Sequence, residues 1–367
     1  MDAETKTIVD SFERGVRLNL SHQYEDSVKE LTKAIGLNLS VAAAKVAYYT
    51  RGNSYKALGK YEEAIADYTR VIELDGNYVD AYLNRGNSYH MLGELEKAID
   101  EYTLAIGIDP NYVIPYQNRA LRNNDIARRN NDIKRYDIAL KDCSKAIELK
   151  ADNAFSYYVR GLVNLNLRNN KKSTDDLNMA IELYSKAIVN DLGNADNYYR
   201  RAGCYSLLKQ YYMAIDDCTE AIKINPMKIE LYYYRGEDYY KLGEYKKAIE
   251  DFSKAIELDV NYADAYEKRG LCYDKVGQHE EALEDYNRAI QLDPENPYFY
   301  YNRGIAYQDL GEDDSSIASF TKAIELNPNF AIAYYKRNES YLRLKKTEEA
   351  MADYKKALEL APDGLPI

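Results

Sequence analysis

Histidine and cysteine have the clearest potential for metal binding or nucleophilic chemistry in this sequence. The three histidines are widely separated along the chain, at His22, His90 and His279. The four cysteines include no C-x-x-C pair and stand at Cys143, Cys204, Cys218 and Cys272. Without paired ligands or a glycine-rich phosphate loop, we interpret the thiols as reduced packing residues. We therefore predict no metal site, no cofactor and no enzymatic activity.

The composition limits the class of partner. The 367 residues hold 49 Lys and Arg against 60 Asp and Glu, which gives a formal net charge of −11. Nucleic-acid binding needs clustered positive charge, so no nucleic-acid partner is expected. The sequence has no apolar run of about eighteen residues and no signal-peptide pattern near its start, so we expect a cytoplasmic protein without a membrane partner.

An arginine, usually followed by Gly or Ala, recurs along the chain and defines a repeat. The spacing is mostly 34 residues, with steps of 37, 41 and 41 elsewhere. The ten arginines are Arg14, Arg51, Arg85, Arg119, Arg160, Arg201, Arg235, Arg269, Arg303 and Arg337. Each repeat has the pattern of two amphipathic helices of about fourteen residues joined by a turn.

Other positions of the repeat are equally regular. Position 4 is aromatic in nine repeats, position 8 is small in nine, and position 20 is Ala or Ser throughout. Small residues at positions 8 and 20 let two antiparallel helices approach closely, and Pro at position 32 ends the repeat where it occurs. No single repeat can bury its apolar face alone, so stability must come from stacking on neighbours.

This pattern resembles the tetratricopeptide repeat family, whose unit also has 34 residues. The resemblance covers nearly the whole chain and implies an all-α fold, a right-handed superhelical solenoid of antiparallel helix pairs with the first helices lining a concave groove. We predict one solenoid over residues 1–367, with repeats at 8–41, 45–78, 79–112, 113–153, 154–194, 195–228, 229–262, 263–296, 297–330 and 331–364.

Position 7 departs from the family pattern, because it is arginine in every repeat where the family usually has leucine. Position 23, on the second helix, is acidic in nine of the ten repeats, and repeat 9 has Ser319 there. Antiparallel packing brings positions 7 and 23 to similar heights. We therefore predict an arginine–carboxylate pair in most repeats.

Repeats 4 and 5 each have seven extra residues, which correspond to about two helical turns. In repeat 4 we expect the insertion to lengthen the first helix or its turn, and in repeat 5 to lengthen the second helix. Residues 119–141 around the first insertion contain seven basic and three acidic residues. They form either a solvated rim or a contact for an acidic partner.

The resemblance also implies where a ligand would bind. Family members hold peptides against positions 2, 5, 6, 9, 12 and 13 of the first helices, with asparagines at 6 and 9. In repeats 2 to 5 these positions are nearly neutral, and they give the candidate peptide-binding residues Tyr49, Asn53, Asn84, Asn87, Met91, Ile114, Gln117, Asn118, Leu121, Tyr158 and Leu162. Asparagine amides can pair with the backbone of an extended peptide, and the apolar residues can anchor its side chains. Alternatively, the lengthened helices cover the apolar residues.

A comparison within the family narrows the functional interpretation. A subgroup of the family binds C-terminal carboxylates through lysines, but Tyr49, Ile114 and Asn118 stand where the cations would be, so that function is not expected here. We predict a non-catalytic scaffold that binds a protein or peptide in the groove of repeats 2 to 5. The alternatives are a structural element that self-associates through its C-terminal repeat, giving a homo-oligomer, and a regulatory module of a larger assembly.

Overall fold

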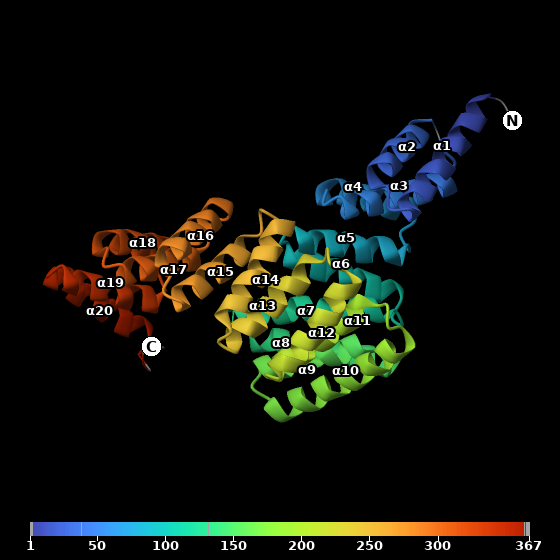
Figure 1. The fold of residues 1–367 in the computed structure, drawn as a ribbon. Coiled ribbons are helices and arrows are strands. Elements are labelled where there is room, and N and C mark those ends of the chain that lie inside the picture. Colours follow the sequence, from blue (N-terminus) through green and yellow to red (C-terminus); the bar gives the residue numbers. More distant parts are fainter. Residues whose placement is uncertain (1–2, 38, 131, 363, 365–367) are drawn as a thin grey trace. The chain divides into compact units, whose positions relative to one another are not determined.

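The computed structural model describes residues 3–37, 39–130, 132–362 and 364, and their secondary structure is helical (Figure 1). Twenty helices occur in this part of the chain. The first ten are α1 (Ala3–Leu20), α2 (Tyr24–Gly36), α3 (Val41–Ala57), α4 (Tyr61–Leu74), α5 (Val79–Met91), α6 (Leu95–Ile108), α7 (Val113–Asn130), α8 (Ile133–Leu149), α9 (Ala154–Asn166) and α10 (Asn170–Asn190). The others are α11 (Ala195–Leu207), α12 (Tyr211–Ile224), α13 (Ile229–Lys241), α14 (Tyr245–Leu258), α15 (Ala263–Lys275), α16 (His279–Leu292), α17 (Pro297–Asp309), α18 (Asp313–Leu326), α19 (Ala331–Arg343) and α20 (Thr347–Leu360).

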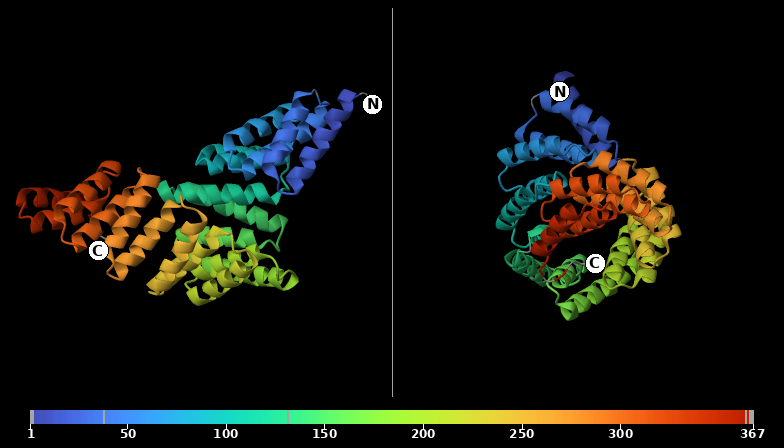
Figure 2. Two further views of the ribbon diagram at one scale, coloured as in Figure 1. Left: turned by 45° about the horizontal axis from the view of Figure 1, so that its top comes forward. Right: turned by 90° about the vertical axis from the view of Figure 1, so that its left-hand side faces the viewer.

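The chain divides into two compact units, Met1–Leu183 and Tyr184–Ile367, which we call the N-terminal and C-terminal units. Within each unit, successive helices pack as antiparallel pairs and each pair stacks on the next, which confirms the predicted helical solenoid architecture (Figure 2). The extension of one continuous solenoid over residues 1–367 stays a prediction. None of the helices in the described residues is both long enough and apolar enough to span a bilayer.

The odd-numbered helices form the inner layer of each unit. In the N-terminal unit α1 contacts α3, α3 contacts α5 and α7 contacts α9, and in the C-terminal unit α13, α15, α17 and α19 contact one another in series. Among the described residues, no comparable contact joins α2 to α4 or α14 to α16. In a curved stack the layer with the closer spacing is the inner one, so the odd-numbered helices face the concave side of each unit.

Close helix contact within a pair depends on glycine at position 8. A Cβ atom on Gly304 of α17 would lie 2.6 Å from Cε1 of Phe320 on α18, and a Cβ atom on Gly86 would lie 2.7 Å from Cε1 of Tyr102. Where position 8 is Ala, at Ala120 and Ala202, position 24 of the same repeat is a buried cysteine, Cys143 or Cys218. The side chain at position 24 is thus smaller where the residue at position 8 is Ala than where it is Gly.

The predicted arginine–carboxylate pair is confirmed in nine repeats. The N···O distance is 2.6–2.8 Å in eight of them and 3.4 Å in the first. The pairs are Arg14–Glu30, Arg51–Asp67, Arg85–Glu101, Arg119–Asp142, Arg160–Asp176, Arg201–Asp217, Arg235–Asp251, Arg269–Asp285 and Arg337–Asp353. In repeat 9, Arg303 Nε donates to Ser319 Oγ at 3.2 Å instead.

The extra residues lengthen helices in both long repeats. In repeat 5 the second helix, α10, has 21 residues against 14 in regular repeats, as predicted. In repeat 4 the first helix, α7, grows to 18 residues, and α8 also grows to 17, which the sequence did not predict. Asn131, which falls within the inserted stretch of repeat 4, lies outside the described residues. Arg119 still meets Asp142, because the added residues lie at the end of α7 and the start of α8, beyond both side chains.

Candidate functional site: the inner layer of the N-terminal unit

The eleven candidate residues all belong to the odd-numbered helices α3, α5, α7 and α9. Met91 and Ile114 are exposed, with 55% and 42% of their surface accessible, whereas Gln117 is only 5% exposed. The remaining eight are half-buried, which suits residues at the floor of a groove: Tyr49, Asn53, Asn84, Asn87, Asn118, Leu121, Tyr158 and Leu162.

Two asparagines are oriented by tyrosines of the outer helices. Tyr68 donates its hydroxyl hydrogen to Oδ1 of Asn53 at 2.8 Å, and Tyr102 does the same for Asn87 at 2.9 Å. Each tyrosine lies fifteen residues after its asparagine. Because the hydroxyl bonds to the amide oxygen, Oδ1 of Asn87 points toward Tyr102 and its Nδ2 group faces away from Tyr102.

A further amide bridge joins α5 to α7. Asn118 donates from Nδ2 to Oδ1 of Asn87 at 3.0 Å. The hydrogen bonds within the described chain leave Nδ2 of Asn87 and Oδ1 of Asn118 without partners. The two side chains thus offer one donor and one acceptor next to each other, which is the pattern of an extended backbone.

Asn84 belongs to a second network, between α3 and α5. It donates from Nδ2 to the hydroxyl of Tyr49 at 2.9 Å and accepts from Nζ of Lys56 at 2.7 Å. Burial, followed by the charge of Asp80, raises the pKa of Tyr49 to about 12, against the opposing effect of hydrogen bonds with Asn53 and Asn84. Burial lowers the pKa of Lys56. Tyr49 is therefore a neutral phenol at physiological pH, and Lys56 adds a cation that the sequence analysis overlooked.

Gln117 does not line the groove, and its assignment is corrected here. Its Nε2 donates to Asn153 Oδ1 and to Ser156 Oγ, both at 2.7 Å, and these bonds join α7 to the start of α9. The repeat position alone suggested an inner-layer residue. The neighbouring polar residues at the start of α9 bury it instead.

The apolar candidates divide between core and surface. Leu121 and Tyr158 pack against a buried cluster that includes Ala120, Val159 and Val163. Ile114 and Met91 keep the most accessible surface. The apolar area open to a ligand is therefore smaller than the sequence suggested.

A buried histidine–arginine contact beside the groove escaped the sequence analysis. Arg122 of α7 places Nη1 2.7 Å from Nδ1 of His90 on α5, in contact with Nε2 as well, and Nη2 lies 3.3 Å from Asp125. Burial, followed by the charge of Arg122, lowers the pKa of His90 to about 4. The sequence feature that could have predicted this contact is the arginine at position 10 of repeat 4, where other repeats have residues such as Ser54, Ser88 and Cys272.

Three of the seven basic residues in the stretch 119–141 pair with carboxylates of the fold. Arg119 pairs with Asp142, Arg122 with Asp125, and Arg135 with Glu96 at 2.6 Å. Four others are exposed: Arg128, Arg129, Lys134 and Lys141. Three of the seven positive charges are thereby neutralised within the fold, which favours the interpretation as a solvated rim.

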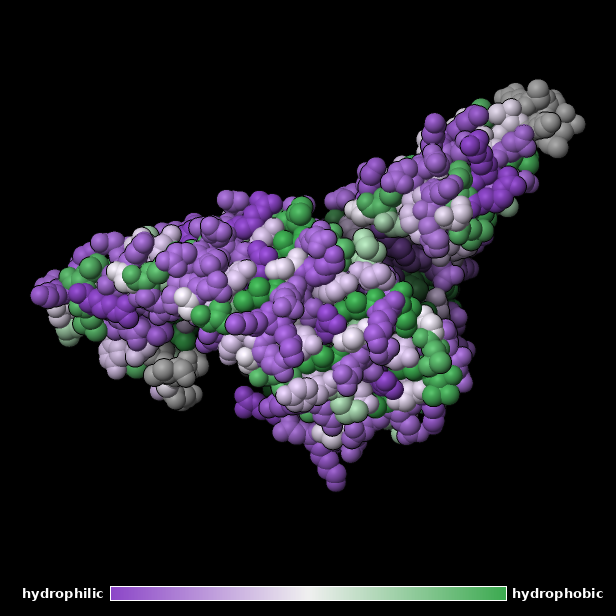
Figure 3. Space-filling model, in the orientation of Figure 1, coloured by the Kyte–Doolittle hydropathy of each residue, from purple (hydrophilic) through white to green (hydrophobic). Residues whose placement is uncertain are grey.

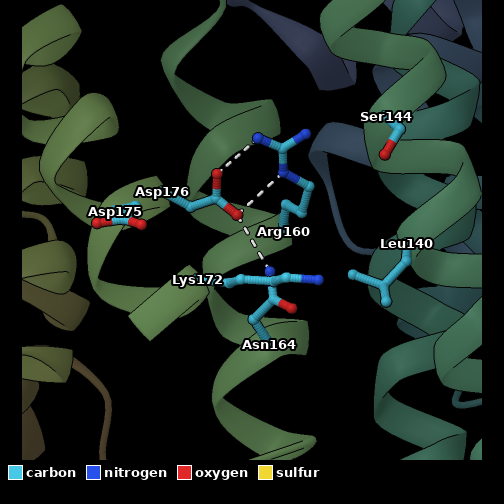
Figure 4. Close-up of a pocket in the computed structure, with 7 residues that line it drawn as sticks. All are labelled: Leu140, Ser144, Arg160, Asn164, Lys172, Asp175 and Asp176. Carbon is cyan, nitrogen blue, oxygen red and sulfur yellow. Dashed lines mark hydrogen bonds and ion pairs between the residues drawn. The ribbon is translucent and has the colours of Figure 1, made fainter. Parts of the chain in front are cut away.

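An open pocket of about 420 Å³ lies where one regular contact is missing (Figure 4). In eight repeats Nη1 of the position-7 arginine bonds, at 2.8–3.0 Å, to a Ser, Thr or Asn of the preceding repeat, which lies sixteen residues earlier in seven of them and nineteen earlier in repeat 2. Arg160 bonds only to Asp176 among the described residues, and Ser144 stands apart from it. The pocket is lined by Leu140, Ser144, Arg160, Asn164, Lys172, Asp175 and Asp176. Lys172 and Asp175 oppose each other in charge, so the lining selects neither anions nor cations.

Other chemistry is sparse in the described part of the chain. No group of three His, Cys, Asp or Glu residues gathers there in a way that could hold a metal ion. The cysteine thiols are buried, and burial raises the pKa of all four. On the face drawn in Figure 3, hydrophobic residues form small groups among hydrophilic ones.

Models of known families match much of the sequence. One described as "TPR repeat" matches residues 52–93, 236–277 and 275–311. Two described as "Tetratricopeptide repeat" match 79–112, 195–228 and 297–330, and 319–352. Together these matches cover more than half of the chain. The comparison with curated proteins finds no match.

Solved structures of repeat proteins are similar in fold. A tetratricopeptide repeat protein from Parabacteroides merdae is 19% identical, with 73% of this chain and 99% of that chain covered and a TM-score of 0.57. The MamA protein is 27% identical, with coverages of 46% and 92% and a TM-score of 0.43. YrrB, described as a TPR protein with an unusual peptide-binding site, is 24% identical, with coverages of 50% and 94% and a TM-score of 0.44.

Proposed function

Because this chain belongs to the tetratricopeptide repeat family, we propose that it is a non-catalytic scaffold that holds an extended segment of a partner protein on the inner layer of its N-terminal unit. The family assignment makes the chain a protein-interaction scaffold. The proposal adds the surface, repeats 2 to 5, and the mode of binding. Cytoplasmic location and the absence of nucleic-acid and membrane partners stay predictions.

The observation that carries the proposal is the oriented amide pair of Asn87 and Asn118. A peptide in extended conformation presents N–H and C=O groups along its length, and the pair can satisfy one of each irrespective of peptide sequence. Met91 and Ile114, exposed nearby on α5 and α7, supply apolar contacts for side chains. Asn84 and Lys56 add a second polar contact on the adjacent helices.

The test uses the full chain and a displayed library of random peptides. A peptide selected on the wild-type protein is labelled, and its affinity is measured by fluorescence anisotropy for wild type, Asn118→Ala, Asn84→Ala and Ile114→Asp. Each lost hydrogen bond should weaken binding about three- to tenfold. Asp137→Ala, an exposed residue of the outer helix α8, serves as control and should bind as wild type does. Unchanged affinity for both asparagine variants, with helicity preserved by circular dichroism, would refute the proposed surface.

A second candidate function is self-association through the last helix. Within the described residues, α20 leaves the side chains of Met351, Tyr354 and Leu358 exposed on one face. An exposed apolar face of this kind favours contact with another copy. Sedimentation velocity at two protein concentrations should show a larger species that Met351→Glu removes. A concentration-independent monomer would exclude this alternative.

A further inference from the structure

The inner layer of the C-terminal unit has an aromatic surface of different chemistry from the amide groove. Tyr234 of α13 is 43% exposed, although it occupies a repeat position that is Asn or Lys in repeats 3, 4, 8, 9 and 10. Its ring centroid lies 5.7 Å from that of Tyr199 on α11 and 5.4 Å from that of Tyr233. Tyr233 in turn lies 5.1 Å from Tyr262. Four tyrosine rings from two successive repeats thus form one continuous group.

Three carboxylates surround this group. Glu230 and Glu237 lie four residues before and three after Tyr234, on the same face of α13, and Asp264 comes from α15. Within the described residues, none of the three has a hydrogen-bond or ion-pair partner. Burial raises the pKa of Tyr234, and a hydrogen bond with Tyr199 opposes this shift. The charges of Glu237, Glu230 and Asp264 raise the pKa further, so these three carboxylates lie close enough to act on the ring. We call these seven residues the tyrosine–carboxylate patch.

The edge of the patch already holds a cation of the protein itself. Lys228, which precedes α13, places Nζ 4.4 Å from the ring centroid of Tyr199 and 3.1 Å from Asp196. This is the geometry of an ammonium bound between an aromatic face and a carboxylate. Around Tyr234 the same elements recur, an exposed ring with carboxylates beside it, but no cation in the described part of the chain pairs with these carboxylates.

We propose that the tyrosine–carboxylate patch binds a lysine or arginine side chain of a partner protein. The cation rests on the exposed face of Tyr234, and Glu230, Glu237 and Asp264 compensate its charge. A neutral or acidic segment gains nothing from the ring and meets unpaired carboxylates, so the patch selects basic segments. The proposal concerns a different unit from the amide groove and does not depend on it.

The test measures binding of a labelled peptide of alternating glycine and lysine, blocked at both ends, to the full chain by fluorescence anisotropy at physiological salt. A matched peptide with glutamine in place of lysine is the ligand control. The lysine peptide should bind more tightly than the glutamine peptide. Tyr234→Leu, which keeps apolar volume but removes the aromatic face, should weaken it about three- to tenfold. Glu237→Gln with Asp264→Asn should weaken it at least as much.

Matched variants separate this site from general acidity and from the amide groove. Tyr212→Leu removes an exposed tyrosine from the outer helix α12, and Glu280→Gln removes an exposed carboxylate from α16; neither should change lysine-peptide binding. Asn118→Ala should not change it either, whereas Tyr234→Leu should leave binding of a groove-selected peptide intact. The proposal is overturned if the lysine peptide does not bind, if the glutamine peptide binds equally well, or if Tyr234→Leu has no effect.

Discussion

At the residue scale, the position-7 arginine connects three helices at once. Arg51 donates from Nε and Nη2 to Asp67 at 2.8 and 2.7 Å, from Nη1 to Thr32 of the preceding repeat at 2.9 Å, and lies over the ring of Tyr48. Burial raises the pKa of Asp67, and the hydrogen bonds and charge of Arg51 oppose that effect. The pair therefore offsets a desolvation cost, and removing one member leaves the other charge buried.

Asp67→Asn should destabilise the protein by about 3–5 kcal/mol, because it leaves the Arg51 guanidinium without its anion. The side chain of Arg51 is only 15% exposed, so water cannot replace the carboxylate. Urea unfolding monitored by circular dichroism measures the change. In the first repeat Arg14 is 66% exposed, so Glu30→Gln is the matched control and should cost less than about 1 kcal/mol. Equal losses in the two variants would contradict the role assigned to burial.

Repeat 9 allows the opposite experiment, in which a carboxylate is added beside the position-7 arginine and not removed. Arg303 has Ser319 Oγ and Asn287 Oδ1 as hydrogen-bond partners, and no carboxylate pairs with it among the described residues. Ser319→Asp should restore the pair and raise the free energy of unfolding by about 1–3 kcal/mol. Ser319→Asn has nearly the same size without the charge. If it stabilises as much as Ser319→Asp, then shape and not charge limits this repeat.

His90 should make stability depend on pH. Its folded pKa of about 4 lies below the ordinary value of 6.5, so the folded protein binds fewer protons than the unfolded chain between these values. The stabilising contribution is complete above about pH 6.5 and is lost as pH falls toward 4. Because the ring is half-buried, we expect a loss of only about 1–2 kcal/mol. Urea midpoints at neutral and mildly acidic pH should differ less in His90→Gln than in wild type; an identical pH dependence in both would be inconsistent with this assignment.

Sequence reasoning succeeded for residues whose partners are set by the repeat and failed for those whose partners come from an irregular place. The Arg51–Asp67 spacing of sixteen residues recurs, so the pair could be predicted. The bond to Thr32 also recurs but crosses to the preceding repeat, and the analysis within one repeat missed it. Gln117 was misassigned because its partners, Asn153 and Ser156, follow a lengthened helix pair whose geometry no other repeat supplies.

At the element scale, glycine at position 8 sets how closely the two helices of a repeat approach. Gly304→Ala should destabilise by about 1–3 kcal/mol, because the new Cβ would lie 2.6 Å from Phe320. Gly107 is also helical, in α6, and a Cβ there would meet nothing within 4 Å. Gly107→Ala should therefore stabilise by about 0.5–1 kcal/mol. Thermal unfolding of the two variants gives the comparison, and a shift of the same sign in both would contradict the packing argument.

The insertions show what helix periodicity can predict. Seven residues were expected to preserve the face of a lengthened helix, and Asp176 and Ser185 of α10 agree. Asp176 bonds to Arg160 of its own repeat, and Ser185 bonds to Arg201 of the next at 2.9 Å. In repeat 4, the choice of helix that takes up the insertion depended on tertiary contacts of α7, such as the hydrogen bond from Asn166 to Asn124 at 2.8 Å. Helix periodicity could not predict these contacts.

At the scale of the whole molecule, the two proposed surfaces differ in what they recognise. The amides of Asn87 and Asn118 match a backbone and place little demand on side chains. The ring of Tyr234 with Glu230 and Asp264 demands a cation. A chain with net charge −11 repels acidic segments in general, so local chemistry and the overall field favour the same class of partner.

Contacts in each unit join only neighbouring helices, so the effect of a destabilising substitution should be confined to the helices around it. In the C-terminal unit α17 contacts α15, α16, α18 and α19, and no more distant helix among the described residues. Stability in such an array is close to a sum of repeat and interface terms, and parts of it open separately. The Gly304→Ala variant should therefore exchange amide hydrogens faster in α16 to α19, about tenfold for each 1.4 kcal/mol lost, while α3 to α6 keep wild-type rates. Hydrogen exchange read by mass spectrometry resolves these segments. Faster exchange by the same factor in α3 to α6 would mean that the chain unfolds as one cooperative block, contrary to the nearest-neighbour packing.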